Sequence, residues 1–173
     1  ACFGGHGDSP RVVLAAANVE DCFYTAIEAV NIARKFSAPV ILLSDQAIAT
    51  RIEAFNEPNL KDICQDLTPD MTPTPTHKPY DLESETGASR HRAPGTRIED
   101  GRYPVVTGLE HDEWGHPSAS PDLHDAMTKK RRNKLNALAN ELPVPEVYGA
   151  DSGEVLIVGW GSTTGPLYEA VDN

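Results

Sequence analysis

The chain has 173 residues, of which 39% are hydrophobic and 24% charged, a balance that is ordinary for a globular protein. Lys and Arg number 15 against 26 for Asp and Glu. The resulting net charge of -11 repels phosphate backbones and argues against a nucleic-acid partner. No apolar run approaches the roughly 20 residues that a membrane-spanning helix needs, so no membrane partner is expected either.

The cysteines are Cys2, Cys22 and Cys64, and no two of them form a CxxC pair. An odd number without that spacing argues against a disulfide scaffold, a zinc knuckle or an iron–sulfur site in this chain. The cysteine pattern therefore favours a reducing compartment, and we expect a cytoplasmic protein.

Two apolar runs flank an amphipathic stretch in the first part of the chain. Arg11 to Ala15 and Val40 to Leu43 predict strands that are covered on both faces. Asn18 is a good helix N-cap, and Arg34 and Lys35 stand near the expected helix end. Apolar residues recur between them at helical spacing, namely Val19, Cys22, Phe23, Ala26, Ile27, Val30 and Ala33. The pattern predicts a βαβ unit with a right-handed crossover, as part of a larger parallel sheet.

The character of the chain changes after this unit. After Ser44, Asp45 and Gln46, a further helical stretch is expected to run to about Phe55. From Pro58 to Arg102 the sequence is rich in Pro, Thr, Asp and Glu, and apolar residues no longer recur at a helical or strand spacing. Such a stretch is too long for an ordinary loop within a compact domain, so it is predicted to be a Pro-rich linker.

The last part of the chain returns to regular patterns. Tyr103 to Thr107 predicts a modest strand, and Ser120 followed by Pro121 predicts the start of a helix that ends before Pro143. Glu154 to Gly159 predicts another strand, and Gly165 to Asn173 the opening of a helix. The unsupported βαβ unit, the severed strand and helix, and the missing initiator Met lead us to expect a fragment.

A polar loop between these elements concentrates ionisable side chains. Two imidazoles and three carboxylates stand within seven residues, namely Glu110, His111, Asp112, Glu113 and His116. The spacing matches no zinc motif and no distant third ligand is evident, so no metal site is assigned. A solvated loop and an active-site or interface loop both remain open.

Two glycine-rich segments and one basic run also leave alternatives open. Gly5, His6, Gly7 and Asp8 precede a strand, either as a plain connection or as a subunit-contact loop. The turn from Gly159 to Gly165 follows a strand and opens a helix, as a phosphate-binding turn does, but such a motif alone is weak. The basic run is either a solvated helix face or a contact with an acidic partner, and consists of Lys129, Lys130, Arg131, Arg132 and Lys134.

Taken together, five segments resemble the alpha subunit of 2-oxoacid:acceptor (ferredoxin) oxidoreductases. They occur in the family's order and cover nearly the whole chain outside the Pro-rich stretch. They are Gly4 to Ala15 (GGHGDSPRVVLA), Val19 to Phe23 (VEDCF), Pro39 to Gln46 (PVILLSDQ), Thr107 to Pro117 (TGLEHDEWGHP) and Val155 to Thr163 (VLIVGWGST).

The resemblance implies an α/β fold and a division of the chain. Residues 1–57 would be the C-terminal part of a thiamine-diphosphate pyrimidine-binding domain, and residues 58–102 the linker. Residues 103–173 would contain a strand, a loop, a helix and the truncated start of a domain like the transketolase C-terminal domain.

The resemblance also implies a reaction, the oxidative decarboxylation of a 2-oxoacid to an acyl-CoA with electrons passed to ferredoxin. Overall likeness favours the 2-oxoglutarate type. Thiamine diphosphate with Mg²⁺ would lie between this subunit and a beta subunit, with iron–sulfur clusters on other chains or domains. The family's activating glutamate, its YPITP-like loop and its substrate-binding arginine precede Gly4. No catalytic residue is therefore assigned to this fragment, which is not expected to bind the cofactor or act alone. The alternative is a non-catalytic α/β module that binds a nucleotide or a partner.

Overall fold

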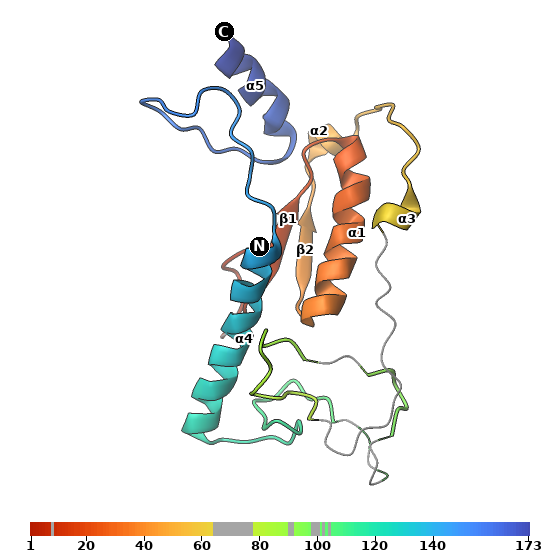
Figure 1. Cartoon of the computed structure of the whole chain (residues 1–173), viewed down its shortest axis with the longest axis vertical. Helices are drawn as coiled ribbons and strands as arrows, with labels where there is room; N and C mark the ends of the chain where they lie inside the picture. The colour runs from red at the N-terminus through yellow and green to blue at the C-terminus, as the bar shows by residue number, and fades with distance from the viewer. Residues whose placement is uncertain (8, 64–77, 90–91, 98–100, 102, 104) are drawn as a thin grey trace.

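The computed structural model describes residues 1–7, 9–63, 78–89, 92–97, 101, 103 and 105–173 (Figure 1). The elements in chain order are β1 (Val12–Ala15), α1 (Val19–Phe36), β2 (Val40–Leu43), α2 (Gln46–Ala49), α3 (Leu60–Ile63), α4 (Pro121–Glu141), a single 3₁₀ turn η1 (Gly161–Thr163) and α5 (Thr164–Asp172).

The predicted βαβ unit is confirmed. β1 and β2 pair in parallel with Val12 opposite Val40 and Ala15 opposite Leu43, and α1 forms the crossover between them. The Asn18 side chain accepts a hydrogen bond from the Asp21 N–H at 2.8 Å, which caps the first turn of α1 as expected. The helix ends at Phe36, and the C-cap residue Ser37 has a left-handed conformation with a φ of 48°.

The apolar face predicted for α1 is partly wrong. The residues of α1 that become buried are Thr25, Ile32 and Phe36, whereas Ala26 and Val30 are exposed. The sheet formed by the described residues has two strands, and it covers only a narrow stripe of the helix. The remaining apolar positions would suit a broader sheet.

The core lies between α1, the sheet and α4. Val12, Ile32, Phe36, Ala38 and Leu138 form one buried cluster. In Figure 1, α1 and α4 flank the two strands on opposite sides. As predicted, Ser120 caps α4 and Pro121 occupies its first turn, where the missing N–H of proline costs no hydrogen bond.

Three expectations about local structure are corrected. The helix expected to reach Phe55 ends at Ala49. The Thr50 backbone N–H donates to the Gln46 carbonyl, and the Arg51 N–H donates to the Ile48 carbonyl at 3.2 Å, a 3₁₀-type bond that closes the last turn. Residues 154–159 are not in a strand, and Val155 and Val158 are 81% and 85% exposed. Val105 to Thr107 are not in a strand either. A strand needs a paired neighbour, and the sequence pattern alone could not show that none of the described residues supplies one.

The stretch predicted to be a linker contains α3 and a series of turns in its described residues. Residues 64–77, 90–91, 98–100 and 102 lie outside the described residues. The turns from Ser84 to Ser89 pack on other elements: the Ser37 hydroxyl donates to the Ser89 carbonyl at 2.8 Å, and the Lys130 ammonium donates to the Gly87 carbonyl. The division at residues 57 and 102 therefore stays a prediction. Among the described helices, none is long and apolar enough to cross a membrane.

Candidate functional site

Glu113 fastens the polar loop to the turns that follow residue 77. Its carboxylate accepts two hydrogen bonds from the Lys78 ammonium, both at 3.1 Å, and one from the Leu82 backbone N–H at 3.0 Å. Its carbonyl accepts from the Tyr80 N–H at 3.0 Å. The hydrogen bond to Glu113 raises the pKa of Lys78, which stabilises the charged pair.

Asp112 shapes the tip of the loop. Its Oδ1 accepts hydrogen bonds from the Trp114 and His116 backbone N–H groups, each at 2.9 Å. Its own N–H donates to the His116 carbonyl at 2.9 Å, and Gly115 takes a φ of 88° to complete the turn. Partial burial raises the pKa of Asp112, but the hydrogen bonds from His116 and Trp114 outweigh it, so the pKa lies below its usual value. Asp112 thus serves as the internal cap of this turn.

Glu110 ties the base of the loop to α4. The Arg131 guanidinium donates to both carboxylate oxygens, each at 3.2 Å, and His124 makes a close contact with the same carboxylate. The hydrogen bonds from Arg131 lower the pKa of Glu110 to about 2. This two-pronged pairing fixes the direction of the loop as well as its distance from the helix.

The two histidines of the loop differ in their surroundings. The ring of His111 lies 3.9 Å from the ring of Tyr80, centroid to centroid, and its Nδ1 is 2.8 Å from the Asp112 carbonyl oxygen. The His116 side chain is 55% exposed, with Nδ1 3.5 Å from Asp112 Oδ2. Of the five loop residues, His116 is therefore the one whose side chain is most available to an incoming group.

The three carboxylates that the sequence brought together do not converge on a common point. Each holds a different part of the chain: residues 78–82, the loop tip or α4. Within the described residues, no group of three or more His, Cys, Asp and Glu side chains is placed to hold a metal ion. These hydrogen bonds hold the loop in one shape and leave the His116 side chain exposed.

The basic side chains of α4 point in two directions, some toward the interior and others toward solvent. Lys130 is buried, and Lys134 is partly buried and donates to the Ser37 carbonyl at 2.8 Å. Burial, together with the charge of Lys134, lowers the pKa of Lys130 to about 8. Lys129 and Arg132 point to solvent. Neither earlier interpretation of the run anticipated these inward lysines, although Met127, Lys130, Lys134 and Leu138 share one helical face and the spacing gave that signal.

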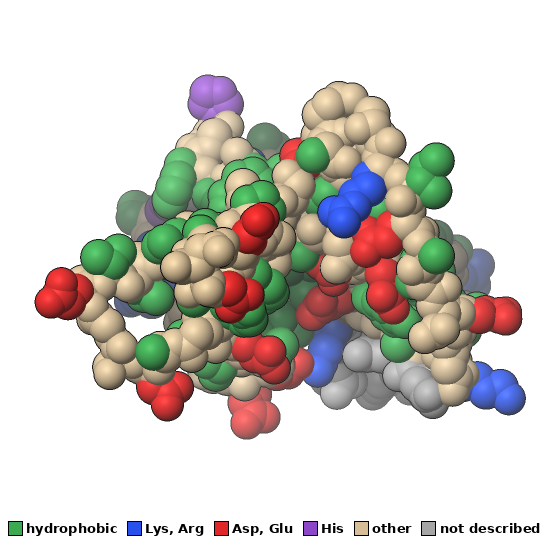
Figure 2. Space-filling model, turned by 90° about the horizontal axis from the view of Figure 1, so that it is seen from above, with side chains coloured by type: hydrophobic (Ala, Val, Ile, Leu, Met, Phe, Trp, Pro, Cys, Tyr) green, Lys and Arg blue, Asp and Glu red, His purple; other side chains and the backbone are tan. Residues whose placement is uncertain are grey.

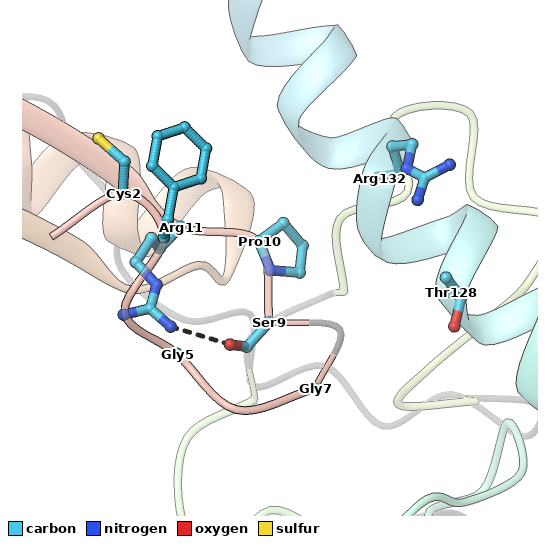
Figure 3. A pocket seen from close by; sticks show the side chains of 9 residues that line it. Cys2, Gly5, Gly7, Ser9, Pro10, Arg11, Thr128 and Arg132 are labelled. Atoms are coloured by element: carbon cyan, nitrogen blue, oxygen red, sulfur yellow. Dashed lines mark hydrogen bonds between the residues drawn. The ribbon is translucent and has the colours of Figure 1, made fainter.

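The N-terminal glycine loop borders an open pocket. Gly5, His6 and Gly7 are exposed, and Gly7 takes a φ of 64°; Asp8 lies outside the described residues. Figure 3 shows the loop on one side of the pocket and α4, with Thr128 and Arg132, on the other. The Arg11 guanidinium folds back over the loop and donates to the Ser9 hydroxyl at 3.0 Å.

The glycine turn at the other end of the chain forms η1 and leads into α5. The Ser162 N–H, which would face a phosphate in a nucleotide-binding turn, donates to the Asp45 carboxylate at 2.9 Å. This contact counts against the alternative of a nucleotide-binding module.

The parallel βαβ unit gives the chain an α/β fold. Residues 1–130 match the family model described as pyruvate flavodoxin/ferredoxin oxidoreductase, thiamine diP-binding. The chain therefore belongs to this family of thiamine-diphosphate-binding oxidoreductases, as the resemblance in the sequence predicted.

Several individual relatives are similar over almost the whole chain. It is 37% identical over 172 residues to 2-oxoglutarate oxidoreductase subunit KorA of Mycobacterium tuberculosis. It is 32% identical over 178 residues to subunit alpha of 2-oxoacid:ferredoxin oxidoreductase 2 of Aeropyrum pernix. Both alignments cover 98% of this chain and 26% of the relative, so the chain spans about a quarter of their length.

A solved structure supports the same relationship. The 2-oxoglutarate:ferredoxin oxidoreductase of Magnetococcus marinus, with 2-oxoglutarate, coenzyme A and succinyl-CoA bound, matches with a TM-score of 0.83 at 36% identity. The match covers 99% of this chain and 30% of that one. It therefore includes the polar loop, α4 and the Gly161 region as well as the βαβ unit.

Proposed function

We propose that the chain is part of the thiamine-diphosphate-binding alpha subunit of a 2-oxoglutarate:ferredoxin oxidoreductase. In the intact complex, a 2-oxoacid and coenzyme A are converted to an acyl-CoA and CO₂, and the two electrons released pass to ferredoxin. The observation that carries the proposal is the match of nearly the whole chain to an enzyme solved with 2-oxoglutarate and coenzyme A.

The cofactor supplies the chemistry of decarboxylation, and the protein's part is to bind, orient and shield it. The three carboxylates of the candidate loop are held by partners within the chain, so they do not fit the role of a cofactor-activating acid. We therefore assign no catalytic step to them. Mg²⁺ is proposed to accompany thiamine diphosphate, and iron–sulfur clusters are proposed to lie on other chains or domains.

The partners of the chain are proposed to be a beta subunit, ferredoxin or a similar acceptor, the 2-oxoacid and coenzyme A. Exposed apolar side chains fit a chain that packs on more protein. At the end of the molecule that carries α5, Figure 2 shows apolar side chains between scattered acidic ones. Among the described residues, Val155, Leu156 and Val158 are apolar side chains with exposed fractions of 81%, 78% and 85%. A cytoplasmic location remains part of the proposal, on the ground of the cysteine pattern.

One loop is proposed to face the beta subunit or the entrance of the active site, and a second loop is proposed to contact another subunit. The first contains Glu110, His111, Asp112, Glu113 and His116, and its support is the rigid hydrogen-bonded frame that leaves His116 exposed. The second contains Gly5, His6, Gly7 and Asp8, and its support is the open pocket that it borders.

The test is an assay of the intact alpha subunit produced together with its beta subunit. Reduction of ferredoxin is followed with coenzyme A present, and 2-oxoglutarate is compared with pyruvate and with a branched 2-oxoacid. A kcat/KM for 2-oxoglutarate that exceeds the others supports the assignment. A preference for pyruvate corrects the substrate and leaves the reaction class in place, while no reduction with any 2-oxoacid refutes the proposal.

A further inference from the structure

Asp45 follows β2 at the carboxyl end of the sheet, and its two carboxylate oxygens have different partners. Oδ1 accepts hydrogen bonds from the backbone N–H groups of Ala47 at 3.0 Å and Ile48 at 3.1 Å, which caps α2. Oδ2 accepts from the Ser162 N–H at 2.9 Å. The second bond spans 117 positions of the sequence, so one side chain joins the βαβ unit to the last part of the chain.

The turn that meets Asp45, here called the Gly161 turn, consists of Trp160 to Thr163. Gly161 is buried and has a φ of 68°, a conformation that favours glycine. A Cβ at this position would lie 2.9 Å from Asp45 Oδ2 and 4.0 Å from the Ala16 carbonyl oxygen. Glycine is therefore needed here for the backbone conformation and for the close approach of the carboxylate.

The Gly161 turn is also closed by its own side chains. The Thr163 hydroxyl donates to the Trp160 carbonyl at 2.6 Å, and the Thr164 hydroxyl donates to the Gly161 carbonyl at 2.9 Å. These bonds hold the turn in a shape that presents the Ser162 N–H to Asp45. The hydrogen bond from Ser162, followed by the one from Ile48, lowers the pKa of Asp45, so the acceptor is an ionised carboxylate.

The contact between Asp45 and Ser162 lies beyond the carboxyl end of β2. In open α/β sheets, ligands bind beyond the carboxyl ends of the parallel strands. In Figure 1, α5 lies over α2 at that end of β1 and β2. Here the chain's own turn and carboxylate occupy part of the position that a ligand takes in many such folds.

We propose that Asp45 and the Gly161 turn form an intramolecular clasp, which fixes residues 160–172 over the βαβ unit, and that the turn holds this carboxylate in place of a nucleotide phosphate. The clasp does not depend on which 2-oxoacid the enzyme uses. Its role is to fix where α5 begins relative to the βαβ unit, although a long stretch of sequence separates them.

The test compares three variants of the intact subunit by hydrogen exchange of the peptide that contains Ser162 and by limited proteolysis of residues 143–159. Asp45→Ala removes both hydrogen-bonding roles. Asp45→Asn keeps one acceptor oxygen, which can serve either the cap of α2 or the Ser162 N–H. At the other position its NH₂ group faces a backbone N–H, and two donors cannot form a hydrogen bond. Gly161→Ala leaves Asp45 in place but puts a methyl group against it. The matched control is Gly95→Ala, where φ is 86° and a Cβ would meet nothing within 4 Å.

Each clasp variant should raise the rate of exchange at the Ser162 peptide and of cleavage in residues 143–159 by about three- to tenfold, while the middle of α1 keeps its exchange rate. Gly95→Ala should raise neither rate. In a double-mutant cycle, Gly161→Ala should have a smaller effect when Asp45 is already alanine, because the methyl group then has no carboxylate to meet.

Two results would overturn the clasp. The first is a Ser162 peptide that exchanges at the same rate in the parent protein and in Asp45→Ala. The second is protection of that peptide in the parent protein by ADP or inorganic phosphate, which would return the turn to phosphate binding. Both measurements are independent of turnover, so a wrong substrate assignment leaves them unaffected.

Discussion

The Arg131 guanidinium on α4 donates two hydrogen bonds of 3.2 Å each to the Glu110 carboxylate at the base of the polar loop. The Arg131 Nε atom is buried and has no hydrogen-bond partner among the described residues. The guanidinium also donates to the Thr128 hydroxyl at 3.1 Å, and the Glu110 carboxylate compensates its positive charge. Glu110 has two roles: its carboxylate attaches the loop to α4, and its carbonyl accepts from the Ser118 N–H at 2.9 Å, which closes the base of the loop.

Substitution of Glu110 by Gln should lower the free energy of unfolding by about 1–2 kcal/mol at pH 7, a value between those of exposed and buried ion pairs. The pKa of Glu110 is lowered from 4.5 to about 2 in the folded protein. Its stabilisation is therefore complete above the unfolded-state pKa and is lost as the pH falls from about 4.5 to about 2. Urea unfolding at a series of pH values should show the parent and the variant converging in that window.

The control for this prediction is Asp125→Asn, which breaks the exposed pair between Asp125 and Lys129 on the same helix. Its cost should be below about 0.5 kcal/mol. Equal losses from both variants would show that the Glu110 pair behaves as an ordinary surface ion pair.

The sequence predicted those parts of the fold that depend on local signals. The Asn18 and Ser120 caps, the two apolar strands and the α1 crossover follow from neighbouring residues, and the structure confirms them. The expected strand at residues 154–159 failed because strand formation depends on a partner that local pattern does not specify.

The candidate site shows the same limit. The density of ionisable residues identified residues 110–116 as a candidate site. It could not show that the carboxylates of Glu110, Asp112 and Glu113 bind three different parts of the chain. The partners Lys78 and Arg131 are 35 and 21 positions away from the carboxylates that they bind. The contact between Asp45 and Ser162 spans 117 positions and had no local signal beyond the glycine at position 161.

Lys130 should give the protein a rise in stability at alkaline pH. Its pKa is lowered from 10.5 to about 8, chiefly by burial, so between these values the unfolded chain binds more protons than the folded one. The free energy of unfolding should therefore increase as the pH rises through this window, by about 1–3 kcal/mol from this group. Lys130→Met should remove that part of the rise, and the rise due to Lys134, whose pKa is lowered by burial, should remain.

Lys129→Met is the matched control, because it removes one positive charge from the next position, which is exposed. Its stability profile between pH 8 and pH 10.5 should run parallel to that of the parent. If Lys130→Met also runs parallel to the parent, the ammonium is not buried in solution.

The 173-residue chain should not bind thiamine diphosphate on its own. The resemblance to the family places the activating glutamate before Gly4, and the carboxylates of the polar loop are already engaged. Calorimetric titration with the cofactor and Mg²⁺ should give no heat of binding, whereas the intact alpha and beta subunits together should bind. Micromolar binding by the chain alone would contradict the proposed division of the cofactor site.

The polar loop should act through His116 if it faces the beta subunit or the active-site entrance. Asp112→Ala is a poor test, since it removes the cap on the Trp114 and His116 N–H groups and alters the whole turn. His116→Gln keeps the backbone N–H that Asp112 binds and replaces an exposed ring whose Nδ1 lies 3.5 Å from Asp112 Oδ2. His124→Gln, at a side chain of nearly equal exposure on α4 (54% against 55%), is the matched control.

In the reconstituted complex, His116→Gln should lower kcat/KM or the affinity for the beta subunit by at least about fivefold, which corresponds to about 1 kcal/mol. A contact that becomes desolvated on assembly would cost more, about 2–5 kcal/mol, because a charged partner is then left unpaired. His124→Gln should change both quantities by less than about twofold, since its ring contacts Glu110 within the chain and Arg131 continues to hold that carboxylate. Steady-state kinetics and subunit titration measure the two quantities separately. If His116→Gln changes neither, the loop is a structural connector between residues 78–82 and α4.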